Sequence, residues 1–393
     1  MTQIARGLAD IAITETRLSR VDGEAGRLLI GGFAVEELAP NACFEETLFL
    51  LWNDRLPSPA ELSALRAGLA ERRALAPATL ALLRAAADAG TAPMDALRMG
   101  AATLGLAEPG LHRTELQARP AGEVRQTALR LVAALPVVAA AYHRLCQGRE
   151  PVVPDPALDH AASYLHLLTG EVPAPGQARA LATYLNTTAD HGMNASTFTA
   201  RVVASTRSCL SSAIVAALGA LKGPLHGGAP GPALDMVFDL QRRADATGRS
   251  LESVTEQWVR DQVAKGERIM GFGHRVYRVR DPRADVLGAA VERLFPERDD
   301  DGLYRRARTV EQGVLDVLAE LKPDRVLQTN VEFYTALLLH GLGLPSPLFT
   351  PTFAVARVAG WTAHVLEQID EDRLIRPRVV YAGAEGRRWA GAA

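Results

Sequence analysis

Helical segments dominate this sequence, and few stretches show the alternation of apolar and polar residues that is typical of strands. Four apolar runs, mostly rich in alanine and leucine, each predict a helix: Thr79–Ala89, Gln126–Cys146, Ser211–Leu221 and Pro351–Gln368. Ser58-Pro59-Ala60-Glu61 combines a capping box with proline at the first helical position, which marks a helix start. Short strands are expected only at Arg27–Phe33 and Arg378–Tyr381. The pattern therefore predicts an all-α protein.

Size and charge bound the possible classes of protein. The chain has 393 residues, of which 48% are hydrophobic, so two domains with buried cores are expected. A formal net charge of -2 gives no general attraction for nucleic acid or for an anionic membrane. The apolar stretch Leu131–Tyr142 is too short to cross a bilayer and predicts a buried helix, kinked at Pro136. The charged stretch Glu297–Glu311 predicts a solvated helix or loop.

Cysteine usage favours a reducing compartment. The three cysteines, Cys43, Cys146 and Cys209, are too few and too scattered for a disulfide framework. No cysteine and histidine spacing typical of a metal site occurs, so no metal is expected. The first residues lack the apolar core of a signal peptide. A cytoplasmic protein is therefore expected.

Three of the nine histidines lie in turns marked by glycine, proline or asparagine. The turns are Asp190–Arg201 (DHGMNASTFTAR) with His191, Gly223–Ala229 (GPLHGGA) with His226, and Ile269–Arg283 (IMGFGHRVYRVRDPR) with His274. Glycine beside a histidine lets the backbone turn tightly and approach a ligand closely. An ordinary turn between helices is the alternative for each one alone. Together with the many arginines, the three turns favour a site for a small polyanion and acid–base chemistry at a carbonyl.

Two arginines and one glutamate stand out beside these turns. Arg283 follows Asp281-Pro282, a turn that can aim its guanidinium at a carboxylate; a surface salt-bridge cluster is the alternative. Arg357 lies in an otherwise apolar helix, and a buried arginine needs an anion from the protein or from a ligand. Glu332 precedes the apolar run Phe333–Leu339, and a helix start would keep its carboxylate ionised near neutral pH.

The GPLHGGA, GFGHRVYR–DPR and ARVAGW–AH segments together resemble the citrate synthase family in order and spacing. The resemblance extends over nearly the whole chain, from Gly7-Leu8-Ala9-Asp10 to Tyr381-Ala382-Gly383. It implies a two-domain helical fold, with a large domain at 1–227 plus 341–393 and a small mobile domain at 228–340. It also implies a homodimer with shared active sites, since the chain lacks room for the N-terminal extension of hexameric relatives.

The resemblance implies three catalytic residues. His274 matches the histidine that polarises and protonates the carbonyl of oxaloacetate, and His226 matches the one that hydrogen-bonds the thioester oxygen of acetyl-CoA. Glu332 falls where the family has its general base, which is usually aspartate, so the chain is expected to belong to a divergent branch. The residue types suit this chemistry, because a carboxylate can remove a thioester α-proton only if a fixed donor stabilises the enol oxygen.

Five further residues match ligand contacts of the family. His191, Arg283, Arg357 and Arg376 match residues that bind oxaloacetate, and the equivalent of Arg376 reaches in from the neighbouring subunit. Arg278 matches a contact to a phosphate of coenzyme A. The coenzyme A thioester would be a substrate, and no cofactor is expected.

Three functions stay open at this stage. The first is citrate synthase, which condenses acetyl-CoA with oxaloacetate and water to give citrate and coenzyme A. The second is 2-methylcitrate synthase, which uses propionyl-CoA, because pockets that differ by one methyl group discriminate only ~10–200-fold. The third is a weakly active paralogue that binds coenzyme A or dicarboxylates as a sensor, a possibility raised by the longer base Glu332.

Overall fold

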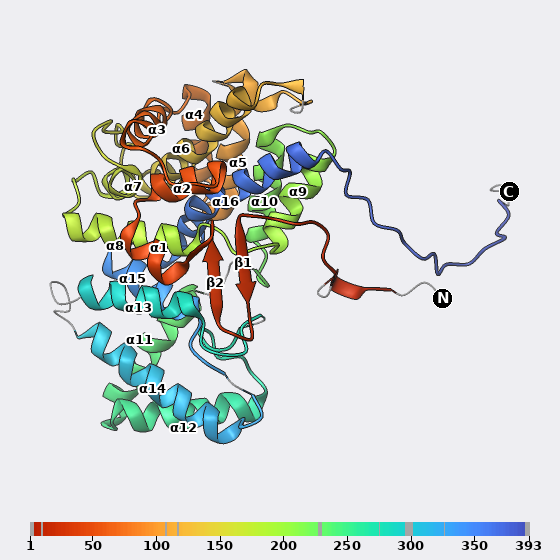
Figure 1. The fold of residues 1–393 in the computed structure, drawn as a ribbon. Coiled ribbons are helices and arrows are strands. Elements are labelled where there is room, and N and C mark those ends of the chain that lie inside the picture. Colours follow the sequence, from red (N-terminus) through yellow and green to blue (C-terminus); the bar gives the residue numbers. More distant parts are fainter. Residues whose placement is uncertain are drawn as a thin grey trace.

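The computed structural model describes residues 4–8, 11–106, 108–115, 118–226, 230–274, 276–294, 302–325 and 327–389. In these residues the chain forms sixteen α-helices and one small sheet (Figure 1). The first ten helices are α1 (Val35–Asn41), α2 (Phe44–Asn53), α3 (Pro59–Glu71), α4 (Pro77–Asp88), α5 (Pro93–Thr103), α6 (Ala121–Cys146), α7 (His160–Thr169), α8 (Pro175–Thr188), α9 (Ala195–Ser205) and α10 (Leu210–Leu221). The others are α11 (Pro230–Thr247), α12 (Leu251–Lys265), α13 (Pro282–Leu294), α14 (Leu303–Leu321), α15 (Val331–Gly341) and α16 (Phe349–Glu371). The predicted all-α class is confirmed.

Proline and short polar side chains set where many of these helices begin. Helices α3, α4, α5, α8, α11 and α13 all start at a proline, which has the right φ and lacks only an N–H that would be unpaired there. The predicted capping box at α3 is present, since the N–H of Glu61 donates to Ser58 and the Glu61 carboxylate accepts from the Ser58 backbone. Local sequence therefore fixes these helix starts.

Helix α6 forms the centre of the core. It packs against α3, α4, α5, α7 and α16, and every residue of Leu131–Tyr142 is buried. Among the described residues it is the one helix long and apolar enough to cross a membrane, but 89% of its apolar window lies inside the protein. The prediction of a buried helix is confirmed, although the helix extends well beyond the apolar stretch.

A three-stranded antiparallel sheet lies near the middle of the molecule (Figure 1). Its strands are β1 (Ser19–Asp22), β2 (Arg27–Ile30) and β3 (Phe33–Ala34), and Leu28 and Ile30 of β2 point into the core. The expected strand at Arg27–Phe33 is present as β2 and the start of β3, whereas β1 was not expected. The turn between β1 and β2 reaches a loop far along the chain, because the N–H of Arg278 donates to the Gly23 carbonyl at 2.8 Å.

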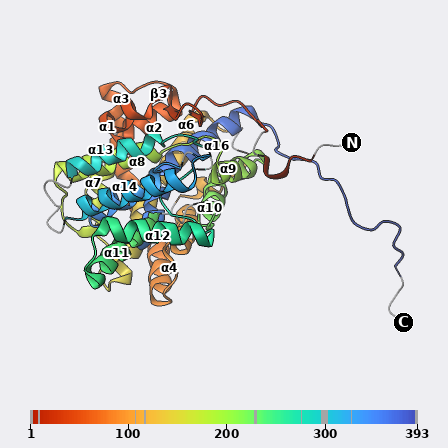
Figure 2. The same cartoon turned by 90° about the horizontal axis from the view of Figure 1, so that it is seen from below.

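The predicted strand at Arg378–Tyr381 is wrong. This segment belongs to an exposed extended tail that follows α16 and projects from the body in both views (Figures 1 and 2). Its side chains suit a strand, but a strand also needs a neighbouring strand to pair with, and this chain offers the tail none among the described residues.

The helices α11, α12, α13 and α14 gather at the opposite end from α3, α4, α5 and α6 (Figure 1). Helices α13 and α15 join the two groups, since both pack against α8. The loops and helix starts at this junction carry the predicted catalytic residues. The predicted domain boundaries near residues 228 and 340 stay a prediction.

Candidate active site

The three singled-out histidines lie at ends of helices that meet at the junction. His191 lies in the turn between α8 and α9, His226 follows α10, and His274 lies in the loop between α12 and α13. The rings of His191 and His274 meet edge to face, with their centroids 5.8 Å apart. The charge of Arg357 acts on both His191 and His226, which links the third ring to the same place.

The hydrogen bonds of His274 determine which ring nitrogen carries the proton. Its Nδ1 accepts the backbone N–H groups of Val276 at 3.0 Å and Tyr277 at 3.1 Å. Burial, and next the charge of Arg283, lowers the pKa of His274 to about 4, so the ring is neutral at pH 7. A neutral ring that accepts at Nδ1 carries its proton on Nε2. Nε2–H is therefore a donor for a ligand.

The guanidinium of Arg283 lies beside this donor. Its Nη2 is 3.3 Å from Nε2 of His274. Both groups donate in this tautomer, so the contact is two donors that face one site rather than a bond between them. Asp281 holds the arginine through bonds of 3.0 Å to Nε and 2.8 Å to Nη2. A ligand oxygen would satisfy both donors at once.

His226 carries its proton on the opposite nitrogen. Its Nε2 accepts the backbone N–H of Ser196 at 3.3 Å and lies 2.8 Å from the Ser196 hydroxyl. Trp361 donates to that hydroxyl at 3.1 Å, which holds Ser196 in place. Burial, and next the charge of Arg357, lowers the pKa of His226 to about 4. The neutral ring therefore presents Nδ1–H as a second donor.

His191 completes the set of neutral rings. Its Nε2 lies 3.0 Å from the hydroxyl of Tyr277. Burial, followed by the charges of Arg283 and Arg357, lowers the pKa of His191 well below its ordinary value. The ring is therefore neutral, chiefly because it is buried, and the two nearby guanidinium groups add to the effect.

Arg357 is a buried cation that no carboxylate pairs with among the described residues. Its Nε donates to the carbonyl of Thr188 at 2.7 Å, and its guanidinium lies 4.6 Å from the centre of the Phe353 ring. Burial, and next the charge of Arg283, lowers the pKa of Arg357 to about 10 although Asp190 acts the other way. Of the two buried arginines, Arg283 is paired with a carboxylate, that of Asp281, and Arg357 is not, within the part of the chain that the structure describes. This excess of buried positive charge favours an anionic ligand with more than one charge.

Glu332 lies in the first turn of α15, beside these cations. The side chain of Asn330 caps the helix by accepting the N–H of Glu332 at 3.0 Å. Burial raises the pKa of Glu332 to about 7, and Asp281 adds to the rise, whereas Arg283 and Arg357 oppose it. Desolvation outweighs the helix dipole here, so this carboxylate is partly ionised at neutral pH. A pKa near the working pH suits a general base.

Backbone pairing joins the His274 loop to the segment before Glu332. Phe272 and Thr329 form an isolated antiparallel bridge, and the N–H of Asn330 donates to the carbonyl of Gly271 at 2.9 Å. Gly271 has φ 88°, and a Cβ there would come within 3.1 Å of Phe333. Glycine is needed at this position because only it combines the left-handed conformation with so close an approach. The donor and the base are thus carried on paired segments.

Two of the predicted ligand residues lie outside this cluster. Arg278 is exposed on the loop after His274, and Arg376 belongs to the exposed tail after α16. Of the three glycine-rich turns, residues 227–229 of GPLHGGA and Arg275 of the His274 turn lie outside the described residues.

Sequence reasoning missed several residues that support the site. Asp281 was noted only as part of a turn, yet it is 1% exposed and also accepts the N–H of Val331 at 3.2 Å. Tyr277 and Ser196 lie inside the singled-out segments but were given no role. The one signal for all three was their position within five residues of a singled-out residue.

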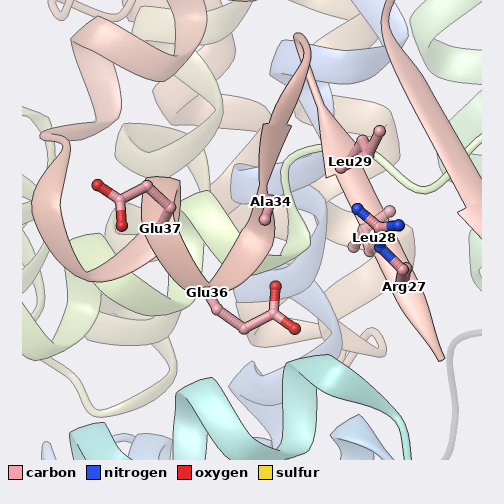
Figure 3. A pocket seen from close by; sticks show the side chains of 6 residues that line it. All are labelled: Arg27, Leu28, Leu29, Ala34, Glu36 and Glu37. Atoms are coloured by element: carbon pink, nitrogen blue, oxygen red, sulfur yellow. The ribbon is translucent and has the colours of Figure 1, made fainter.

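A cavity of about 380 Å³ lies near the site, between the small sheet and α1. Figure 3 shows its lining side chains, which come from β2, β3 and the first turn of α1: Arg27, Leu28, Leu29, Ala34, Glu36 and Glu37. None of the predicted catalytic residues lines this cavity. Among its lining residues, Glu36 has an electrostatic effect on a residue of the site. Its charge adds to the burial that raises the pKa of Tyr277, the neighbour of His191.

The pH dependence of turnover should follow Glu332. We expect kcat/KM to rise with pH and level off above about 7, because the base acts only when its carboxylate is ionised and its pKa is about 7. The histidines are neutral throughout this range, since the pKa values of His226 and His274 are both about 4. The measurement is kcat/KM from about pH 5.5 to pH 9 at constant ionic strength. A profile without any fall towards pH 5.5 would contradict this assignment.

Comparisons with known proteins show the family. The family model "Citrate synthase, C-terminal domain" matches residues 7–378. Citrate synthase of Haloferax volcanii is 40% identical over 382 residues, which are 97% of this chain and 96% of that protein. A 2-methylcitrate synthase of Mycobacterium tuberculosis is 35% identical over 99% of this chain and 93% of its own. The structure of Thermoplasma acidophilum citrate synthase, a ternary complex with carboxymethyl coenzyme A and oxaloacetate, has a TM-score of 0.86 and 28% identity over 100% of this chain and 99% of its own. The chain therefore belongs to the citrate synthase family.

Proposed function

We propose that this enzyme is a citrate synthase, which condenses acetyl-CoA with oxaloacetate and water to give citrate and coenzyme A. One observation carries the proposal. A buried carboxylate with a pKa of about 7 feels the charges of Arg283 and Arg357, and these two arginines also act on neutral histidines that present opposite ring nitrogens as donors. Such a set can form an enol from a thioester and can activate a second carbonyl to receive it.

Each group has a definite task in this reaction. Glu332 removes a proton from the methyl group of acetyl-CoA, while Nδ1–H of His226 stabilises the developing enol oxygen. Nε2–H of His274 polarises the carbonyl of oxaloacetate, and the enol carbon attacks that carbonyl carbon. His274 then supplies the proton that turns the former carbonyl oxygen into the hydroxyl group. Water hydrolyses the resulting thioester and releases coenzyme A.

Oxaloacetate binding belongs to the cations of the site. It carries two carboxylates, and Arg283 and Arg357 are two buried guanidinium groups, each able to bind a carboxylate in bidentate fashion. The charges of both arginines act on His191, which adds a neutral contact. No metal or resident cofactor is required by this scheme, because the histidine N–H groups supply the electrophilic stabilisation. Arg278, exposed on the loop after His274, is proposed to bind a phosphate of coenzyme A.

The runner-up activity is 2-methylcitrate synthase, which uses propionyl-CoA. The relative from Mycobacterium tuberculosis that carries this name keeps the alternative open. Steady-state kinetics with acetyl-CoA and propionyl-CoA, each with oxaloacetate, distinguish the two. A higher kcat/KM for acetyl-CoA would support the proposal, and a higher value for propionyl-CoA would replace it. A weakly active sensor would instead bind coenzyme A or oxaloacetate and turn over both thioesters poorly.

A homodimer with shared sites is part of the proposal. Arg376 lies in the exposed tail that follows α16, and this tail projects from the body of its own chain (Figures 1 and 2). Helix α10 also leaves a shallow hollow of about 670 Å³ against α5, lined by Val215, Ala216 and Gly219 and by the charged residues Asp95, Arg98 and Lys222. A hollowed helix face and a projecting arm are features that a second copy of the chain would cover. Closure of a small domain (228–340) over the substrates, and a cytoplasmic location, belong to the same proposal.

Mixing two inactive variants tests the shared site. Arg376→Ala and His274→Ala should each be nearly inactive as homodimers. After subunit exchange at equal amounts, about a quarter of the wild-type activity should return, because half of the dimers are then mixed and each mixed dimer has one complete site. The measurement is citrate formation before and after exchange, with mixed dimers counted by native mass spectrometry. Mixed dimers without activity would contradict a contribution of Arg376 in trans.

A further inference from the structure

Glu311 is a buried carboxylate in the middle of α14 with its acceptor positions filled. Its side chain is 4% exposed. Oε1 accepts from the Thr329 hydroxyl at 2.6 Å and from Nη1 of Arg280 at 3.3 Å. Oε2 accepts from the Tyr334 hydroxyl at 2.6 Å and from Nη1 of Arg308 at 2.9 Å. The sequence predicted a solvated segment here, and for Glu311 that prediction is wrong.

Two of these donors lie on either side of the base. Thr329 is three residues before Glu332 and Tyr334 is two residues after it, so the carboxylate of Glu311 holds the chain at both ends of the first turn of α15. Thr329 is also the residue that pairs with Phe272 in the bridge to the His274 loop. A displacement of Glu311 would therefore move Glu332 relative to that loop.

The third donor, Arg280, connects Glu311 to the proposed oxaloacetate site. Arg280 precedes Asp281, which holds Arg283 and accepts the N–H of Val331. Arg280 also pairs with Asp285 through its Nε at 2.5 Å, which fixes it on α13. Glu311 is thus the point where α14, the start of α13 and the start of α15 are joined by charged or hydroxyl groups.

Stability alone gives no reason for a carboxylate at this point. Burying an ion costs several kcal/mol, and apolar side chains of similar volume often stabilise a core as well or better. What the carboxylate adds is direction, because four hydrogen bonds set the positions of three separate segments. A shift of about 1 Å in a catalytic group can cost ~100-fold in rate.

We infer that Glu311 is a positioning residue that fixes the carboxylate of Glu332 relative to His274 and Arg283. The inference deepens the proposed function, on which it rests. It assigns the placement of the long base to a carboxylate on α14, a separate helix, rather than to α15 alone.

The test compares variants that remove single bonds of this cluster. Glu311→Gln keeps the shape of the side chain and loses the charge, and Thr329→Val removes one hydroxyl donor. Each should lower kcat by about 10–100-fold, with KM for oxaloacetate changed far less. Thr329→Ser keeps the hydroxyl and should retain kcat within a few-fold. Glu320→Gln, on the same helix but in an exposed pair with Arg260, is the matched control and should match the wild type.

Two further readouts separate positioning from simple loss of structure. The exchange of acyl-CoA α-protons with solvent should fall with kcat in Glu311→Gln, whereas thermal unfolding should show a folded protein. If Glu311→Gln does not fold, the pair Thr329→Val and Thr329→Ser still decides. Folded variants with wild-type kcat and exchange would overturn the inference. Turnover by the wild type tests the proposed function by itself, and the ratios between variants test only the role of Glu311.

Discussion

Glu332→Gln is expected to lower kcat by about 10²–10⁴-fold, the range that a positioned general base contributes. Glutamine keeps the shape of the side chain but cannot accept the α-proton of the thioester. At pH 8 the wild-type carboxylate is mostly ionised, since its pKa is about 7. The measurements are kcat and the rate at which solvent deuterium enters the methyl group of acetyl-CoA. Oxaloacetate binding, followed by calorimetry, should stay close to that of the wild type.

The same variant supplies its own folding control. The pKa of Glu332 rises from the ordinary 4.5 to about 7 on folding, so the folded state holds this proton more tightly than the unfolded state. The wild type should therefore lose stability as pH rises from about 4.5 to about 7, and the loss should persist above that range. Glutamine lacks this ionisation, so Glu332→Gln should unfold at the same or a higher temperature at pH 8. Low activity in a stable protein then reports on chemistry.

Glu332→Asp tests the length of the base. If the cluster around Glu311 has placed the start of α15 to suit glutamate, the shorter side chain should lower kcat by about 10–100-fold. Retained or raised kcat would show that the backbone also suits aspartate and would weaken that explanation. Full turnover by Glu332→Gln would show that the base lies elsewhere, and the proposed mechanism would have to be abandoned.

His274→Ala is expected to lower kcat by about 10²–10³-fold, as removal of one electrostatic donor does in related chemistry. The reason is the loss of Nε2–H, which faces the same site as the guanidinium of Arg283. The measurement is kcat at saturating concentrations of both substrates. KM for oxaloacetate should change less, because Arg283 and Arg357 remain in place.

A second substitution separates this donor from the structure of the turn. Nδ1 of His274 accepts two backbone N–H groups, so alanine also removes an acceptor that shapes the loop. His274→Asn can keep an acceptor near the Nδ1 position while the Nε2 donor is lost, and it should be folded and as inactive as the alanine variant. His143→Asn, at the end of α6, is the control and should leave kcat unchanged. A folded His274→Asn enzyme with near-normal kcat would refute the assignment.

Local signals fixed much of the helical framework. Prolines at first helical positions and the Ser58 capping box predict helix starts because they act on the nearest turn, where no distant residue competes. The tail failed as a strand for the opposite reason, since pairing depends on a partner elsewhere in the chain. The hairpin strand β1 was missed for that reason too.

The residue types and the short motifs were enough to single out His191, His226, His274, Glu332, Arg283 and Arg357, and the structure gathers all six at one junction. The sequence by itself singled out Arg357 as a charge in an apolar helix, and the other five because each lies in or beside a turn with its own glycine, proline or capping residue. Only the tertiary structure decided their chemistry. Burial raises the pKa of Glu332 to about 7, and backbone donors at opposite nitrogens set the tautomers of His226 and His274. Glu311 becomes a buried carboxylate that hydrogen-bonds to residues of three segments. Desolvation and hydrogen-bond direction arise from atoms that come together only on folding, so no local pattern in the chain contains them.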